Sequence, residues 1–310
     1  MRDEIKVFAP ASVTNVGPGF DIMGFALNQP GDEIVLRFTN KPGISILKIT
    51  GDNGKLPLDP LKNTAGLSLI SLAEQLKFDR GIEIEIHKKM GIGSGLGSSA
   101  ASAVASVFAL NEILDRPLSK QQLIQHALRG EELTSGGTPH ADNVSACLFG
   151  GFVIVRSLSP LDVISIPTHE DLYCTVIYPH VEIKTEEARK ILPKQITLQD
   201  AVIQWGNIAA LVAGLSQGNM DIIKRSLNDI ISEPVRSKFI PGYDGIKTAA
   251  MEAGAIGANI SGSGPSVFAL SLTPGNAEII GEAMQKVVSS YNITSDLYIS
   301  KINQNGPRVL

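Results

Sequence analysis

One segment of the chain carries glycine at alternate positions and ends in a pair of serines. It reads Gly91-Ile92-Gly93-Ser94-Gly95-Leu96-Gly97-Ser98-Ser99-Ala100. The alternating apolar and charged residues 82–87 before it predict a strand, and the alanine-rich residues 98–114 after it predict a helix. Glycine allows a close approach by a ligand, and the first turn of a helix offers free amide donors. The segment therefore predicts a polyphosphate site, with Ser98 and Ser99 available to ligate a phosphate-bound Mg²⁺.

Two other nucleotide motifs and one simpler explanation compete with this interpretation. The sequence has no G-x-x-x-x-G-K-[ST], so it lacks a Walker phosphate loop. Gly95, Gly97 and Ala100 match the loose dinucleotide pattern, but that pattern needs a continuously apolar strand before it, and here the strand carries two glutamates. A glycine-rich turn that binds nothing stays open. Four alternating glycines followed by two serines favour phosphate binding.

Three segments together resemble the GHMP kinases, a family of ATP-dependent small-molecule kinases. Residues 93–100 are similar to the family's phosphate loop. The opening, residues 9–21, and a third glycine-rich segment, residues 257–266, agree with the family in order and spacing. The resemblance runs from end to end of the chain. It implies an ATP-binding domain over residues 1–157 and a second domain over residues 158–310 that completes the substrate site.

The opening also points to one branch of this family. Residues 12–15 lack the basic residue of the mevalonate and galactose types. Residues 139–143, 185–189 and 233–236 resemble the branch that phosphorylates the amino acid L-homoserine. An amino acid needs a carboxylate for its ammonium group and arginine for its carboxylate. The resemblance implies a substrate site formed by Asn15, Asp21, His140, Asn143, Thr185, Arg189 and Arg236.

The resemblance further implies where the nucleotide and the metal bind. Glu132 is expected opposite Ser99 as a ligand of Mg²⁺, and Glu131 is expected to face solvent. Mg²⁺ is usually held by one or two protein oxygens together with phosphate oxygens and water, so a single carboxylate suffices. The residues predicted to bind ATP are Asn63, near the base, with Gly91, Ile92, Gly93, Ser94, Gly95, Leu96, Gly97, Ser98, Ser99, Ala100 and Ala101.

The acceptor hydroxyl is expected near Asp142 and Asn143. Many GHMP kinases use a carboxylate in this segment as a general base, and the sequence leaves open which of the two residues faces the hydroxyl. Because phosphoryl transfer has a loose transition state, positioning can supply most of the rate. We therefore expect Asn143 to orient the hydroxyl and Asp142 to support it. With Glu132 and Thr185 they form the predicted catalytic set.

The elements that must position these residues alternate in type. Half-exposed strands in mixed order indicate an α+β fold with antiparallel or mixed sheets. The domain boundary is expected within residues 158–167, where two prolines fall close together. Strands are predicted near residues 5–9, 33–38, 44–49, 82–87, 152–156, 172–178, 266–272 and 297–302, and helices near 64–76, 98–114, 121–133, 186–192, 198–215, 247–253 and 276–289.

Composition limits the range of functions. A formal net charge of -4 over 310 residues gives no general attraction to nucleic acid or to anionic membranes. The sequence has no apolar run that could span a bilayer and no secretory signal at its start, so we expect a cytoplasmic protein, with a homodimer as one option. Cys147 and Cys174 stand apart in apolar stretches and are expected to be buried.

Two alternatives stay open beside the homoserine-phosphorylating kinase. One is a GHMP kinase for another small alcohol, such as mevalonate. The other is a catalytically silent receptor with the same fold, which binds a metabolite and regulates a partner. A receptor has no need to hold Mg²⁺, so the expected pairing of Ser99 with Glu132 favours an enzyme.

Overall fold

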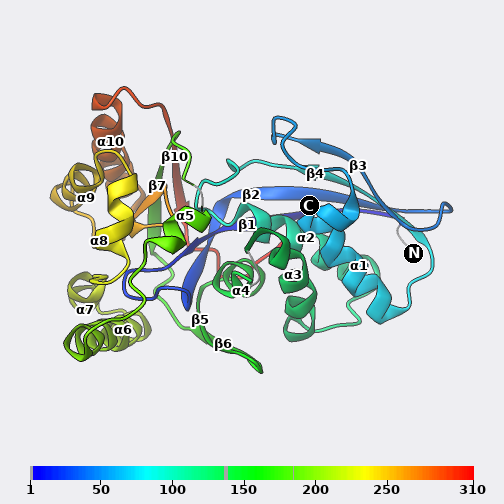
Figure 1. Ribbon diagram of the computed structural model, residues 1–310, viewed down its shortest axis with the longest axis horizontal. Helices are drawn as coiled ribbons and strands as arrows, with labels where there is room; N and C mark the ends of the chain where they lie inside the picture. The colour runs from blue at the N-terminus through cyan, green and yellow to red at the C-terminus, as the bar shows by residue number, and fades with distance from the viewer. Residues whose placement is uncertain (1–2, 136–138, 184) are drawn as a thin grey trace.

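A computed structural model describes residues 3–135, 139–183 and 185–310, which form two sheets with helices packed against them (Figure 1). Within these ranges the larger sheet has seven strands in the path β11-β1-β2-β4-β3, with β5 joined to β2 and β6. The pairings are antiparallel except that of β3 with β4. Its strands are β1 (Glu4–Thr14), β2 (Met23–Thr39), β3 (Ile44–Thr50), β4 (Gly81–His87), β5 (Phe152–Leu158), β6 (Leu161–Ile166) and β11 (Arg308–Val309).

The helices α1 to α4 lie together on one face of the larger sheet (Figure 1). α2 lies at their centre and is buried on almost all sides, because it packs against the neighbouring helices as well as β1 and β2. Its alanines suit this position, since their small side chains allow close packing all around the helix. The helices are α1 (Thr64–Leu76), which follows the short η1 (Pro60–Lys62), α2 (Ser98–Ile113), α3 (Lys120–Ser135) and α4 (Ala141–Phe149).

The smaller sheet is antiparallel, in the order β10-β7-β9-β8, and α9 and α10 pack against it. Its strands are β7 (Tyr173–Pro179), β8 (Gly257–Ile260), β9 (Val267–Ser271) and β10 (Ser295–Lys301). The helices of this half are α5 (Thr185–Lys190), α6 (Leu198–Gln217), α7 (Met220–Ser226), α8 (Glu233–Arg236) with η2 (Ser237–Phe239), α9 (Tyr243–Glu252) and α10 (Pro274–Ser290).

A shared hydrophobic core joins the two sheets. Phe25 of β2 lies with its ring centre 5.7 Å from that of Phe268 of β9, edge to face, and both side chains are fully buried. The ring centre of Phe152 of β5 lies 4.5 Å from that of Phe25. The larger core cluster includes residues from both sheets. The two halves are therefore held together by apolar packing as well as by the chain.

The structure confirms the predicted α+β class with mixed and antiparallel sheets. β4 alternates between buried isoleucines and half-buried charged residues, as its sequence predicts. The cysteines are buried. Residues 158–167, where the boundary is expected, hold β6, which forms a hairpin with β5, so the division at residue 157 stays a prediction. No helix in the described ranges is long and apolar enough to cross a membrane.

Candidate active site

The glycine-rich segment forms the loop between β4 and α2. Gly93, Gly95 and Gly97 have φ angles of 74°, 82° and 67°, in the left-handed region that glycine adopts at little cost. Gly97 occupies the N-cap position of α2 and offers no side-chain acceptor. The amide groups of the first turn therefore remain available to a bound anion.

The third glycine-rich segment packs directly on this loop. Ser261 Oγ donates a hydrogen bond to the carbonyl oxygen of Gly95 over 2.6 Å. A Cβ atom on Gly95 would lie 2.5 Å from the Ser261 carbonyl oxygen and 2.9 Å from that of Gly264. Gly95 is thus required both for its backbone conformation and for the close approach of the two loops.

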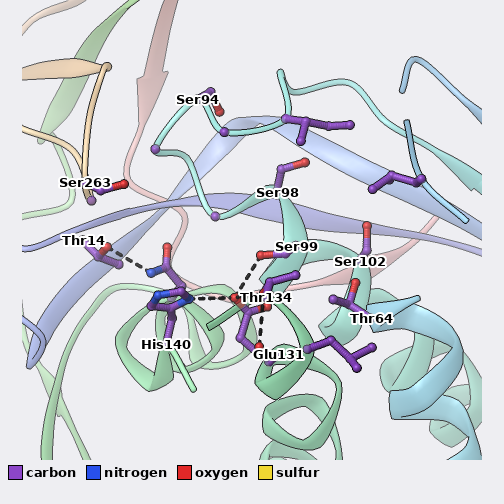
Figure 2. A pocket seen from close by; sticks show the side chains of 18 of the residues that line it. Thr14, Thr64, Ser94, Ser98, Ser99, Ser102, Glu131, Thr134, His140 and Ser263 are labelled. Atoms are coloured by element: carbon purple, nitrogen blue, oxygen red, sulfur yellow. Dashed lines mark hydrogen bonds and ion pairs between the residues drawn. The ribbon is translucent and has the colours of Figure 1, made fainter. Parts of the chain in front are cut away.

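A cavity of about 310 Å³ opens beside the loop, and residues from both halves of the chain line it (Figure 2). Its wall includes α1 and α2, the start of α4, and residues of α3, α5 and α8. The predicted site residues that line it are Asn15, Asp21, Asn63, Ile92, Gly93, Ser94, Gly95, Gly97, Ser98, Ser99, His140, Asp142, Asn143, Arg189 and Arg236.

α3 presents Glu131, rather than Glu132, to the phosphate loop. Glu131 is 1% exposed, and its Oε1 atom accepts a hydrogen bond from Ser99 Oγ over 2.9 Å. Figure 2 shows Ser99, Thr134 and His140 converging on this carboxylate. Glu132 pairs with Arg129 and does not line the cavity. The prediction that Glu132 faces Ser99 is wrong by one residue, because successive side chains of a helix point about 100° apart.

His140 links this carboxylate to the substrate end of the cavity. Its Nδ1 atom lies 2.9 Å from Glu131 Oε1. Burial lowers the pKa of His140, but the hydrogen bond and the negative charge of Glu131 outweigh burial, so the pKa lies above the usual histidine value. The charged form of His140 is therefore favoured beside the Glu131 carboxylate.

The far end of the cavity carries an acid and two arginines. Arg189 Nη2 lies 3.1 Å from each carboxylate oxygen of Asp21. Arg236 is 4% exposed, and it donates to the carbonyl oxygen of Gly262 over 3.1 Å. Its guanidinium carbon also lies 4.8 Å from the centre of the Phe20 ring. Among the described residues, the partners of Arg236 are carbonyl oxygens and this ring rather than a carboxylate.

Asp142 and Asn143 both reach the cavity from the first turn of α4. Asn143 Oδ1 accepts from Ser12 Oγ over 2.9 Å, and its Nδ2 donates to Thr14 Oγ1 over 3.1 Å. These bonds fix the orientation of the amide. Burial raises the pKa of Asp142 to about 6, and the negative charge of Asp21 adds to the shift.

Four of the residues predicted to bind ATP are not among the described residues that line the cavity. Leu96, Ala100 and Ala101 are fully buried in the core and do not line the cavity. Gly91 packs against the ring of Tyr178. Their predicted contacts with ATP stay predictions, because backbone amide groups can bind phosphate where the side chain is buried. The side chain of Thr185 lies outside the described part of the chain.

Comparison with known proteins identifies the family. The sequence pattern of the GHMP kinases N terminal domain matches residues 63–151, and that of the GHMP kinases C terminal region matches residues 208–290. A curated homoserine kinase from Chlorobium phaeobacteroides is 44% identical, with 98% of each chain covered, and one from Chloroherpeton thalassium is 45% identical, with 99% of each chain covered. The chain belongs to the homoserine kinase branch of the GHMP kinases.

Solved structures of GHMP kinases agree with this assignment. A crystal structure of homoserine kinase from Cytophaga hutchinsonii is 54% identical, covers 100% of this chain and 98% of its own, and superposes with a TM-score of 0.97. A mevalonate kinase from L. major, solved in complex with R-mevalonate, is 17% identical, with 97% of each chain covered and a TM-score of 0.72. The second likeness shows that the fold is shared across the GHMP family.

Behind the phosphate loop of this GHMP kinase lies a buried ion pair that the sequence patterns do not indicate. Lys88 pairs with Asp32 of β2, and its Nζ atom donates to the Ser98 carbonyl oxygen over 2.6 Å and to Ser102 Oγ over 2.7 Å. The pair connects the larger sheet to the first turn of α2. The available hint in the sequence is that Lys88 stands shortly before the glycine-rich segment.

Asn63 lines the cavity and also stabilises the start of α1. Its Oδ1 atom accepts from the amide of Ala65, and its Nδ2 donates to the carbonyl oxygen of Pro57 over 3.0 Å. Asn63 thus caps α1 and holds the wall of the cavity that faces the phosphate loop. Its predicted contact with the nucleotide base stays a prediction.

Proposed function

We propose that this protein transfers the γ-phosphoryl group of ATP to the side-chain hydroxyl of L-homoserine, giving ADP and O-phospho-L-homoserine, a step towards threonine. Support comes from the branch to which the chain belongs and from the charges of its cavity. The observation that carries the proposal is the buried Arg236, which faces the cavity beside Asp21 and Arg189.

These charges match a zwitterionic amino acid. A buried guanidinium without a carboxylate partner is costly unless a ligand supplies the anion. The substrate carboxylate would bind to Arg236 and Arg189, and the substrate ammonium group would bind to Asp21. A neutral sugar would leave Arg236 uncompensated. A hydroxy acid such as mevalonate would leave Asp21 without a cation of the substrate.

The phosphate end suits a nucleotide with Mg²⁺. The Oε2 atom of Glu131 is buried without a hydrogen-bond partner among the described residues, which fits a position for a cation. Among the described residues, no three His, Cys, Asp or Glu side chains are placed together to hold a metal ion. Ser99 and Glu131 would hold Mg²⁺ together with phosphate oxygens and water. When bound, Mg²⁺ would neutralise the charge of the phosphates. Glycine backbone and the first-turn amides of α2 would bind the phosphate oxygens.

The acceptor hydroxyl would lie between the phosphates and Asn143. In the transfer, a bond forms between the hydroxyl oxygen and the γ-phosphorus, and the bond from that phosphorus to the β–γ bridging oxygen breaks. The hydroxyl proton passes late to an oxygen of the transferred phosphoryl group. Asn143, held by Ser12 and Thr14, would orient the hydroxyl. Asp142 would support Asn143, because Asp142 Oδ1 accepts from the backbone N–H of Asn143 over 2.9 Å and from its Nδ2 atom over 3.3 Å. Positioning and charge stabilisation would then carry most of the rate.

Release of ADP in the presence of ATP and Mg²⁺ tests the proposal. The acceptors are homoserine, mevalonate, galactose and shikimate, and we expect homoserine alone to give strong release. Arg236→Gln should raise the KM for homoserine at least tenfold, because a charge-assisted contact contributes about 1.5–3 kcal/mol, and should leave the KM for ATP almost unchanged. Equal or better turnover of another alcohol would overturn the assignment. No turnover of any acceptor would favour the silent receptor.

Three finer expectations stay predictions: a cytoplasmic location, a homodimer, and a division into domains at residue 157. Fractionation of cells, light scattering of the purified protein and limited proteolysis would test them in turn.

A further inference from the structure

Two buried polar residues outside the cavity connect the loop that carries Asp21 to the helix that carries Arg236. Gln204 lies in α6 and is 8% exposed, and Asp229 lies between α7 and α8 and is 4% exposed. Neither is among the described residues that line the cavity. Buried polar side chains are costly unless they are bonded, so their partners are informative.

Gln204 bonds to both segments at once. Its Nε2 atom donates to the carbonyl oxygen of Pro18 over 3.1 Å and to Asp229 Oδ1 over 2.9 Å. Its Oε1 atom accepts from the amide of Ile230 over 3.2 Å. Pro18 stands three residues before Asp21, so one amide group joins the acid-bearing loop to the segment that leads into α8.

Asp229 fixes the start of α8. Its Oδ1 atom accepts from the amides of Ile231 and Ser232 over 2.8 and 3.0 Å, and its Oδ2 accepts from the amide of Glu233 over 3.0 Å. α8 has four residues, and its last is Arg236. The position of the Arg236 backbone is therefore set by the carboxylate to which Gln204 donates.

The same two segments meet a second time at the cavity. Phe20, beside Asp21, lies under the guanidinium of Arg236 at 4.8 Å. Contacts thus join the loop and α8 at two places. One is the Arg236 side chain, and the other is the set of hydrogen bonds among Pro18, Gln204 and Asp229, called here the Gln204–Asp229 joint. A substrate that places opposite charges on one carbon needs a fixed separation between its two binding groups, and a displacement of about 1 Å can be costly.

We propose that Gln204 and Asp229 are positioning residues that set the separation between Asp21 and Arg236, and that they thereby produce the preference for a substrate with an ammonium group and a carboxylate on the same carbon. The inference rests on the proposed function. A role in folding alone would weaken binding of all substrates equally. If the two residues position the site, their loss should instead remove the advantage that the doubly charged substrate has over singly charged analogues.

Three acceptors separate these possibilities. Homoserine carries both charges, 3-amino-1-propanol lacks the carboxylate, and 4-hydroxybutyrate lacks the ammonium group. The variant is Gln204→Met, which keeps the length of the side chain and removes its hydrogen bonds. The matched control is Gln199→Met, because Gln199 lies in the same helix and is exposed.

We expect Gln204→Met to lower kcat/KM for homoserine about tenfold or more, mainly through KM, since several hydrogen bonds of the joint are lost together. For the two analogues we expect kcat/KM to change by less than about threefold. Where an analogue is only a competitive inhibitor, the same limit applies to its inhibition constant. The KM for ATP and all values for Gln199→Met should stay at the wild-type level.

Three outcomes would overturn the inference. They are wild-type preference in Gln204→Met, equal losses for all three acceptors, and a parallel rise in the KM for ATP. If Gln204→Met does not fold, Asp229→Asn gives the same test, because it removes an acceptor of the α8 cap while keeping the size of the side chain. A wild-type protein without activity on homoserine would overturn the proposed function and this inference with it. An active wild type together with a Gln204→Met variant that keeps the wild-type preference would overturn this inference alone.

Discussion

At the scale of single residues, the phosphate end depends on which of two adjacent glutamates faces Ser99. Glu131 is buried and bonded to Ser99, whereas Glu132 pairs with Arg129 at the outer side of α3. The two residues have the same chemistry, so each serves as a control for the other.

Glu131→Gln should depress kcat by about tenfold to a hundredfold or more, because a neutral amide no longer balances a cation at this position. Glu132→Gln should stay within about twofold of the wild type, as surface substitutions usually do. The measurement is kcat at several Mg²⁺ concentrations. A larger loss of kcat for Glu132→Gln than for Glu131→Gln would mean that Glu132 is the metal ligand.

The buried carboxylate of Asp142 should make stability depend on pH. Its pKa is raised from 3.8 to about 6 in the folded state, so the folded protein binds more protons than the unfolded chain between these values. The free energy of unfolding therefore falls as pH rises through this window, and the penalty is complete above it. Asp142→Asn removes the penalty and should stabilise the protein by about 3 kcal/mol at pH 8.

Urea unfolding at pH 5 and pH 8 measures this effect. The advantage of Asp142→Asn over the wild type should grow between the two values. Asp79→Asn provides the control, because Asp79 is exposed. If Asp142→Asn stabilises the protein equally at both pH values, the raised pKa of Asp142 is not the cause of the difference in stability.

The same substitution tests whether Asp142 is a general base. We expect Asp142→Asn to lose less kcat than Glu131→Gln, because Asn143 orients the hydroxyl and the proton can leave late in a loose transition state. A general base typically contributes about 10²–10⁴-fold. A loss of that size, with both KM values intact, would show that Asp142 is the base.

At the scale of elements, the phosphate loop and the loop between β8 and β9 support each other. Gly95 touches the second loop, whereas Gly93, with a similar φ of 74°, has nothing within 4 Å of an added Cβ. This contrast separates the strain of the backbone from the contact between the loops.

Gly93→Ala and Gly95→Ala should each cost about 1–2 kcal/mol of stability, because alanine is strained in the left-handed region. Gly95→Ala should in addition raise the KM for ATP, since its methyl group would push on the carbonyl oxygens of Ser261 and Gly264. Thermal unfolding and ATP titrations measure the two effects. Equal KM values for the variants would mean that the contact does not position the phosphate loop.

At the scale of the whole molecule, the substrate end of the cavity is assembled from distant parts of the chain. Asp21 follows β1, Arg189 comes from α5, and Arg236 ends α8. A ligand that bonds to all three therefore ties the two halves together, in addition to their shared core.

Homoserine should accordingly raise the melting temperature more than singly charged analogues at equal concentration. Binding at a hundred times Kd adds about 2.7 kcal/mol of stability, which corresponds to several degrees for a chain of this size. Thermal shift with homoserine, 3-amino-1-propanol and 4-hydroxybutyrate checks this, and Arg236→Gln should abolish the difference. Equal shifts for the three compounds would mean that the charges do not act together.

The sequence by itself determined the phosphate loop, most of the helices and strands, and the family. These follow from local causes: glycine spacing, apolar periodicity and alanine content act over a few neighbouring residues. The helix predicted at residues 64–76 has the observed bounds of α1, and most of the predicted site residues line the cavity. The resemblance to the family, rather than any local pattern, selected Asp21 and the two arginines.

Only the tertiary structure decided which side chains meet. The rotation of α3 against α2 placed Glu131 rather than Glu132 opposite Ser99, and the burial of α2 turned Ala100 and Ala101 into the core. The joint of Gln204 with Asp229 connects segments that are far apart in sequence. Such contacts depend on how whole elements pack, and no pattern within one element encodes the position of another.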